Sequence, residues 1–169
     1  GGRFVTPSFL EPYREMSFMA LTYDARNDIL YASTNGNGVF RINLAQRTIT
    51  PYARDEVNNI VWVDELFFDK DGELWINDAM KNYVYDTKTS KNKQLTLIDD
   101  VVVSTAARIQ KGKQIYFGTD HGLFIYDKQQ GKFVENQQTD MLKDDKIKAL
   151  ELKQNSLWFS SNKGLGCLD

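Results

Sequence analysis

An internal repeat constrains the fold of this chain more than any other feature of its sequence. Aromatic residues recur in similar apolar contexts at separations of 44, 41 and 42 residues, at Tyr31, Trp75, Tyr116 and Trp158. A side chain suited to turns follows each of these anchors after eleven or twelve residues, at Asn43, Asp86, Asp127 and Asp169. A glycine lies between the two in three copies, at Gly38, Gly122 and Gly164. The 169 residues therefore contain about four copies of one structural unit.

Each copy contains four short runs rich in β-branched and aromatic residues, separated by Gly, Asn and Asp. First strands are expected at 18–21, 60–63, 101–103 and 147–150, second strands around the anchors, third strands at 39–42, 83–85, 123–126 and 165–168, and fourth strands at 48–50, 94–97 and 132–134. Four strands in a unit of roughly 40–45 residues predict an all-β fold, a β-propeller of about four blades of four antiparallel strands. Stacked blades would bury the four anchors between neighbouring sheets.

Two segments fit a second interpretation. Residues 52–66 and 139–154 hold helix formers with loosely helical apolar spacing, which on its own predicts short helices. The repeat register places first strands at their ends, and we give the register more weight.

We expect residues 1–169 to be a single propeller region with approximate repeats 17–56, 57–100, 101–140 and 141–169. Residues 2–7 resemble the fourth strand near Phe133 and are expected to form strand d of a neighbouring or closing blade. That strand could close a four-bladed ring beside residues 165–168. The alternative, which we favour, is that the chain is an arc, a fragment of a larger propeller.

Charge and composition exclude several classes of site. The net charge of −2 lacks the basic excess of a nucleic-acid-binding surface. The single Cys167 and single His121 exclude a disulfide framework and a cysteine-based zinc cluster. No apolar run approaches the roughly 20 residues of a membrane helix. No metal, no cofactor and no catalytic residue are therefore expected.

The repeats resemble those of a known family, the two-component regulator propeller. Its motif matches best at residues 60–86, centred on the run 69–76 (DKDGELWI), at 116–127 (YFGTDHGLFIYD) and at 157–165 (LWFSSNKGL). The first copy is weaker, with Tyr31 in place of Trp, and the resemblance covers about residues 17–169. It implies the periplasmic sensor of a Bacteroides-type hybrid two-component system, which responds to glycans. The kinase and response regulator would lie elsewhere in the parent protein, so this chain is not expected to be an enzyme.

In a propeller, the loops before first strands and after second strands gather on one face, where loops commonly carry function. Planar polar groups and aromatic rings there would suit a glycan or another small ligand. The candidate ligand-binding residues are Arg54, Trp62, Asp78, Asp120, His121 and Asn162. Each of these residues also has a purely structural explanation. Trp62 could belong to the core, Arg54 could be a solvated surface charge, and Asp120 and Asn162 could serve only to form turns.

Two other functions stay open on the sequence alone. Propellers also serve as protein-interaction or dimerisation scaffolds, and open blade edges would allow self-association. A propeller lyase or glycosidase is the third alternative, although a metal-dependent lyase would want more than one histidine. Fold alone does not decide among these functions.

Overall fold

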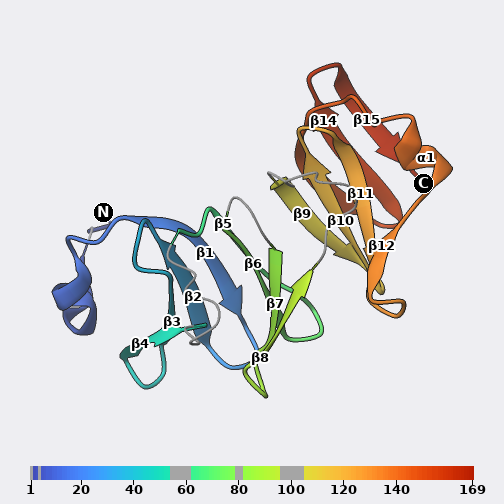
Figure 1. Cartoon of the computed structure of the whole chain (residues 1–169). Coiled ribbons are helices and arrows are strands. Elements are labelled where there is room, and N and C mark those ends of the chain that lie inside the picture. Colours follow the sequence, from blue (N-terminus) through green and yellow to red (C-terminus); the bar gives the residue numbers. More distant parts are fainter. Residues whose placement is uncertain (1, 4, 54–61, 79–81, 96–104) are drawn as a thin grey trace. The chain divides into compact units, whose positions relative to one another are not determined.

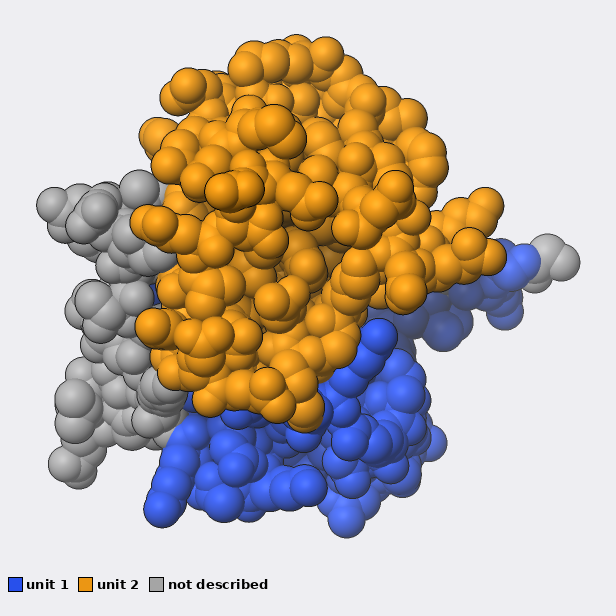
Figure 2. All heavy atoms as spheres, turned by 90° about the vertical axis from the view of Figure 1, so that its right-hand side faces the viewer, with its two compact units in different colours: residues 1–93 blue, residues 94–169 orange. Residues whose placement is uncertain are grey.

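The computed structural model describes residues 2, 3, 5–53, 62–78, 82–95 and 105–169. They form four antiparallel sheets whose strands follow one another in chain order (Figure 1). Contacts divide the chain into unit 1, residues 1–93, and unit 2, residues 94–169 (Figure 2). The predicted all-β propeller fold is confirmed. Among the described residues, no helix has both the length and the apolar character needed to cross a membrane.

The first two sheets come from the N-terminal half. A 3-10 helix, η1 (Ser8–Tyr13), precedes the sheet β1 (Phe18–Asp24), β2 (Ile29–Thr34), β3 (Val39–Asn43) and β4 (Thr48–Tyr52). The second sheet contains β5 (Glu65–Phe68), β6 (Glu73–Asn77), β7 (Asn82–Asp86) and β8 (Lys91–Leu95). The connections between successive strands of a sheet are short turns, which explains the purely antiparallel pairing.

The other two sheets come from the C-terminal half. The third contains β9 (Thr105–Lys111), β10 (Gln114–Thr119), β11 (Gly122–Asp127) and β12 (Lys132–Val134). A single helical turn, α1 (Gln137–Asp140), leads to the last sheet, β13 (Ile147–Lys153), β14 (Ser156–Ser161) and β15 (Gly164–Leu168). The register was therefore the better guide at 139–154, where the chain forms strand β13 and only the last two residues of a single helical turn.

One predicted strand is wrong. The first strand of the second repeat is Glu65–Phe68, not 60–63. The tight turn at 69–72 fixes the pairing of Phe68 with Leu74, so the strand must end at the turn. Of the predicted strand, Trp62 and Val63 lie before β5, and residues 60 and 61 lie outside the described residues. The predicted strand at 101–103 and most of the possible helix at 52–66 lie outside the described residues.

Residues 2, 3 and 5–7 are outside the strands of unit 1. A strand at 2–7 would belong to a neighbouring or closing blade, so its assignment stays a prediction. The choice between a closed ring and an arc, and the predicted repeat boundaries, also stay predictions.

Each unit has its core between two sheets. In unit 1, the Tyr31 ring stacks on Phe68, with centroids 5.8 Å apart and an interplanar angle of 15°, and Val63, Leu74 and Ile76 belong to the same cluster. In unit 2, Ile147, Leu157 and Phe159 pack with Leu123 and the half-buried Tyr116. These sheet-to-sheet contacts bury the apolar side chains that a single sheet would expose.

The anchors do not share one environment. Tyr31 and Trp75 are each 1% exposed, whereas Trp158, expected in the blade core, is 41% exposed. The side-chain alternation of β14 explains this correction. Leu157 and Phe159 point into the core of unit 2, so Trp158 between them points to the opposite side of the sheet.

Candidate functional site

The loop ends of the sheets are where the sequence placed a ligand. In an antiparallel sheet, the end of a second strand lies beside the start of the first strand of the same sheet. Asn35, just after β2, accordingly donates its main-chain N–H to the Ser17 oxygen just before β1, over 3.0 Å. Asn162, just after β14, donates in the same way to the Lys146 oxygen over 3.1 Å. The predicted grouping of these loops is thus reproduced within the first and last sheets.

In unit 1, Trp62 lies on the turn between β2 and β3. It forms an isolated antiparallel bridge with Asn35, and a β-carbon built on Gly36 would lie 3.7 Å from the indole ring. The side chain is nevertheless 59% exposed. We call Trp62 with the turn Asn35, Gly36 and Asn37 the Trp62 platform.

Local sequence explains why this platform forms. Gly36 adopts a φ of 97°, a backbone conformation that glycine tolerates and that residues with side chains rarely adopt. The Thr34 hydroxyl closes the turn by accepting from Asn37 N over 3.0 Å and donating to Gly38 O over 2.8 Å. The next residue in the chain, Val63, is 1% exposed and belongs to the core of unit 1. The core thus holds the segment while the indole face stays in water.

Asp78 follows β6 at the same end of the second sheet. It is half-buried, and the adjacent Asn77 amide donates to Asn82 Oδ1 over 3.2 Å across the turn. Asp64 N also donates to Asn77 O over 3.0 Å, which places the residues after Trp62 next to this turn. Asp78 is therefore near the start of β5, while Arg54 lies outside the described residues.

In unit 2, Asp120 and His121 form the turn between β10 and β11. Both are exposed, and His121 N donates to the Thr119 hydroxyl over 3.0 Å. That hydroxyl donates in turn to Gly122 O over 3.0 Å. The contacts are those of a turn closed by a Ser or Thr side chain, so they support the structural role of this loop.

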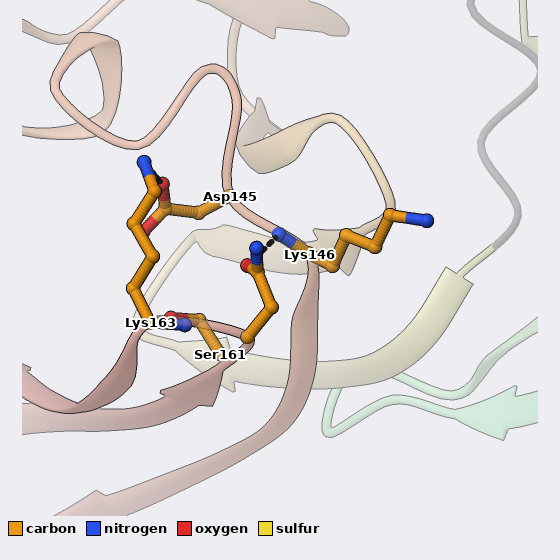
Figure 3. Close-up of polar contacts among 5 residues, drawn as sticks. Asp145, Lys146, Ser161 and Lys163 are labelled. Atoms are coloured by element: carbon orange, nitrogen blue, oxygen red, sulfur yellow. Dashed lines mark hydrogen bonds and ion pairs between the residues drawn. The ribbon is translucent and has the colours of Figure 1, made fainter.

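Asn162 has a clear structural role. Its Oδ1 accepts from Lys146 N over 2.7 Å, so the turn after β14 is fastened to the segment entering β13 (Figure 3). Beside it, the Lys163 ammonium is hydrogen-bonded and ion-paired to Asp145, which is buried (Figure 3). The hydrogen bond to Asp145 raises the pKa of Lys163. Lys163 N also donates to the Ser161 hydroxyl over 3.0 Å.

The structure thus separates the predicted residues into two sets. Trp62 and Asp78 belong to unit 1, and Asp120, His121 and Asn162 belong to unit 2. Sequence reasoning missed a residue type that recurs three positions after an anchor: Thr34, Thr119 and Ser161 close the turns. It also left the asparagines of the Trp62 platform out of the candidates, because the Asn-Gly-Asn turn lies far from Trp62 in the sequence and only the fold brings the two together.

The chemistry of the Trp62 platform suits a small polar ligand with one apolar face. An exposed indole offers a flat apolar surface, and asparagine amides both donate and accept hydrogen bonds. A few polar groups around aromatic surface are typical of small-molecule sites. Within the described ranges, no group of three or more His, Cys, Asp or Glu side chains is placed to hold a metal ion.

Comparisons with known proteins show the fold. No protein-family model matches the sequence. No curated protein matches it either. Among solved structures, the extracellular domain of the BT4673 system from B. thetaiotaomicron has a TM-score of 0.73 at 16% identity, covering 89% of this chain and 20% of that one. The extracellular domain of the hybrid two component system BT3049 from the same organism has a TM-score of 0.68 at 14% identity. That match covers 90% of this chain and 22% of BT3049.

Another structural neighbour is similar in length to this chain. The computationally designed Ika4 protein has a TM-score of 0.66 at 12% identity, and 92% of each chain is covered. The two extracellular domains, in contrast, are much longer, and this chain spans about a fifth of their length. As the sequence resemblance predicted, extracellular domains of Bacteroides two-component systems are among the structural neighbours, at identities that establish the fold alone.

Proposed function

We propose that this chain is part of the extracytoplasmic, ligand-sensing propeller of a hybrid two-component regulator. In this proposal the domain is periplasmic, binds an oligosaccharide and is not itself catalytic. The sequence resemblance and the fold shared with the BT4673 and BT3049 extracellular domains support the sensor class. A histidine kinase in the parent protein would supply the catalytic activity.

The Trp62 platform is the observation that carries the oligosaccharide proposal. A tryptophan that is 59% exposed is uncommon on a surface without a partner, since burying such a ring is strongly favourable. Its ring would pack against the apolar face of a pyranose. The Asn35 and Asn37 amides beside it would bond to the ring hydroxyls.

The test is a glycan array, followed by calorimetry on any saccharide that binds the 169-residue chain. Trp62→Ala should weaken binding by at least about tenfold, equivalent to roughly 1.4 kcal/mol. Trp62→Phe, which keeps an aromatic face, should retain most of the affinity. Met141→Ala is the matched control, since Met141 is 75% exposed and lies in unit 2. Absence of saccharide binding, or equal binding by wild type and Trp62→Ala, would overturn the proposal.

A second candidate function, a protein-interaction or dimerisation scaffold, is favoured by a separate observation. Large apolar side chains are exposed on β1 and on the last sheet, notably Leu21 at 63% and Leu165 at 75%. Exposed apolar surface of this kind marks interaction sites when it is contiguous. A lyase or glycosidase has no comparable support from the described residues.

A further inference from the structure

Two sheet faces of this chain expose apolar side chains. One, which we call the leading face, includes Leu21 and Tyr23 of β1, which are 63% and 48% exposed. The other, the trailing face, includes Trp158, Leu165 and the exposed Cys167 of the last sheet. We propose that the trailing face of one copy of this chain binds the leading face of a second copy. This proposal deepens the scaffold function and rests on that second candidate, not on ligand sensing.

Strand register defines both faces, because side chains of directly paired residues lie on the same side of a sheet. Cys167 pairs with Trp158, and Leu165 pairs with Ser160, so these side chains share one side of the last sheet. On the first sheet, Leu21 pairs with Ala32 and Tyr23 pairs with Leu30.

Unit 1 already contains a junction of the proposed kind. The Tyr31 side of the first sheet packs on the side of the second sheet that presents Leu66 and Phe68. Leu66 pairs with Ile76, and Phe68 pairs with Leu74. Counting from the anchors, Leu21 and Tyr23 occupy in the first sheet the positions that Leu66 and Phe68 occupy in the second. The leading face is therefore the kind of surface on which a Tyr31-type anchor packs.

Unit 2 contains the same junction a second time. Tyr116, the anchor of the third sheet, packs on a cluster that includes Leu150, Leu157 and Phe159 of the last sheet. Leu150 pairs with Phe159, as Leu66 pairs with Ile76. Trp158 holds the anchor position in the last sheet. In both observed junctions, an anchor side packs on a leading-type side, and Trp158 is the anchor left 41% exposed.

A second copy is the occupant to which these observations point. Both faces are exposed in the single chain, and each copy carries one face of each kind. Such head-to-tail contacts form a closed ring when the rotation between copies allows, and two copies would then share two identical junctions. Two sets of four sheets give eight, within the usual range of roughly 4–8 propeller blades.

The first test is the mass in solution by light scattering over a concentration series. The wild type should reach twice the chain mass of 19.5 kDa. Leu21→Lys and Trp158→Lys should each weaken association by at least tenfold, and Met141→Lys should leave it unchanged. An equimolar mixture of Leu21→Lys and Trp158→Lys retains one intact junction, so it should dimerise more strongly than either variant alone. A monomeric wild type, or a mixture no better than its components, would overturn the proposal.

Cross-linking distinguishes a second copy from closure within one chain. Cys167 is the only cysteine of the sequence, so Leu21→Cys places a second thiol on the leading face. A short bismaleimide should then link residues 21 and 167 of different copies and give a product of double mass. A product of single mass, carrying the link within one chain, would refute the second copy as occupant. Equal cross-linking of wild type through two Cys167 residues would refute the head-to-tail orientation. Circular dichroism checks that each variant is folded.

Discussion

Replacing Asp69 should destabilise the second sheet through a hydrogen bond that the sequence motif does not reveal. Asp69 sits in the turn between β5 and β6 and is 2% exposed. Its Oδ1 accepts from Asp71 N and Glu73 N, each over 2.9 Å, and its Oδ2 accepts from the Trp75 indole N–H over 3.0 Å. One carboxyl group therefore closes the turn and satisfies the polar atom of a buried anchor.

The size of the effect follows from these three bonds. Hydrogen bonds to a carboxylate are worth about 1.5–3 kcal/mol each, and a buried donor left without its acceptor costs about 1–3 kcal/mol. Asp69→Ala loses all three acceptors, and we expect a loss of about 3 kcal/mol of unfolding free energy. Asp69→Asn keeps Oδ1 for the two main-chain N–H groups but turns an amide NH₂ toward the indole N–H. We expect this variant to lose about 1–2 kcal/mol.

Urea unfolding followed by circular dichroism measures both variants, with one transition fitted for each unit where two are resolved. With a typical slope of about 2 kcal/mol per molar urea, Asp69→Ala should lower the midpoint by about 1.5 M. A double-mutant cycle isolates the indole bond: Asp69→Asn should lose much less when Trp75 is already Phe. Asp24→Asn is the control, because Asp24 holds the same turn position but bonds the exposed Asn27 amide instead of an indole. If Asp69→Asn has the same effect with and without the indole, the reasoning is wrong.

Three further outcomes are expected. Gly122→Ala should lower the thermal midpoint of unfolding markedly more than Gly164→Ala. Both glycines have a positive φ, but only at Gly122 would a β-carbon meet a main-chain atom, the Leu142 oxygen at 2.6 Å. Equal shifts of the midpoint would contradict this reasoning. Burial raises the pKa of Tyr52 to about 12, so the contribution of its neutral hydroxyl to folding stability is complete below pH 10 and falls as the pH rises from 10 to 12. In thermal scans over that range, Tyr52→Phe should lose less stability than the wild type. Parallel losses in the two proteins would refute this prediction. The main-chain N–H of Gln130 holds the pKa of Asp127 below its ordinary 3.8, so the contribution of this carboxylate to folding stability is present above pH 3.8 and is lost as the pH falls below it. Below pH 3.8, the stability of Asp127→Ala should therefore fall less steeply with pH than that of the wild type. An unchanged slope would count against the hydrogen bonds of this turn as the cause.

The strands were predictable because two independent signals agreed. Alternating apolar residues set the faces, and Asp or Asn set the turns: Asp127 Oδ1 accepts from Gln129 N and Gln130 N, as its place after the anchor required. The prediction failed where only one signal was present. At 60–63 an apolar run ends at Asp64, but the turn that fixes the strand register is the later one at 69–72, so hydrophobicity alone placed the strand five residues too early.

The candidate site was less predictable for a physical reason. An aromatic residue in an apolar run has the same sequence signature whether it enters the core or lies over a turn, so the sequence leaves both positions open for Trp62. Its 59% exposure accompanies the burial of the next residue, Val63, and the ring lies beside Gly36 of a turn that is distant in the sequence. The polar candidates Asp120, His121 and Asn162 illustrate the converse. Residues suited to binding a ligand are also suited to closing turns, and the observed contacts at His121 and Asn162 are turn contacts.

The anchors show most clearly what a repeat can and cannot encode. Tyr31 and Trp158 occupy one position of the repeat, and in each case the neighbours on the strand face the opposite side of the sheet. Yet Tyr31 is 1% exposed and Trp158 is 41% exposed. Local sequence therefore decides which side of a sheet an anchor faces, while the neighbouring sheet decides whether it is buried. It follows that an exposed anchor reports on a neighbour and not on its own repeat. The association assays on Trp158→Lys and on Leu21→Lys, alone and mixed, accordingly test what covers this position, because they change both the anchor and the surface proposed to cover it.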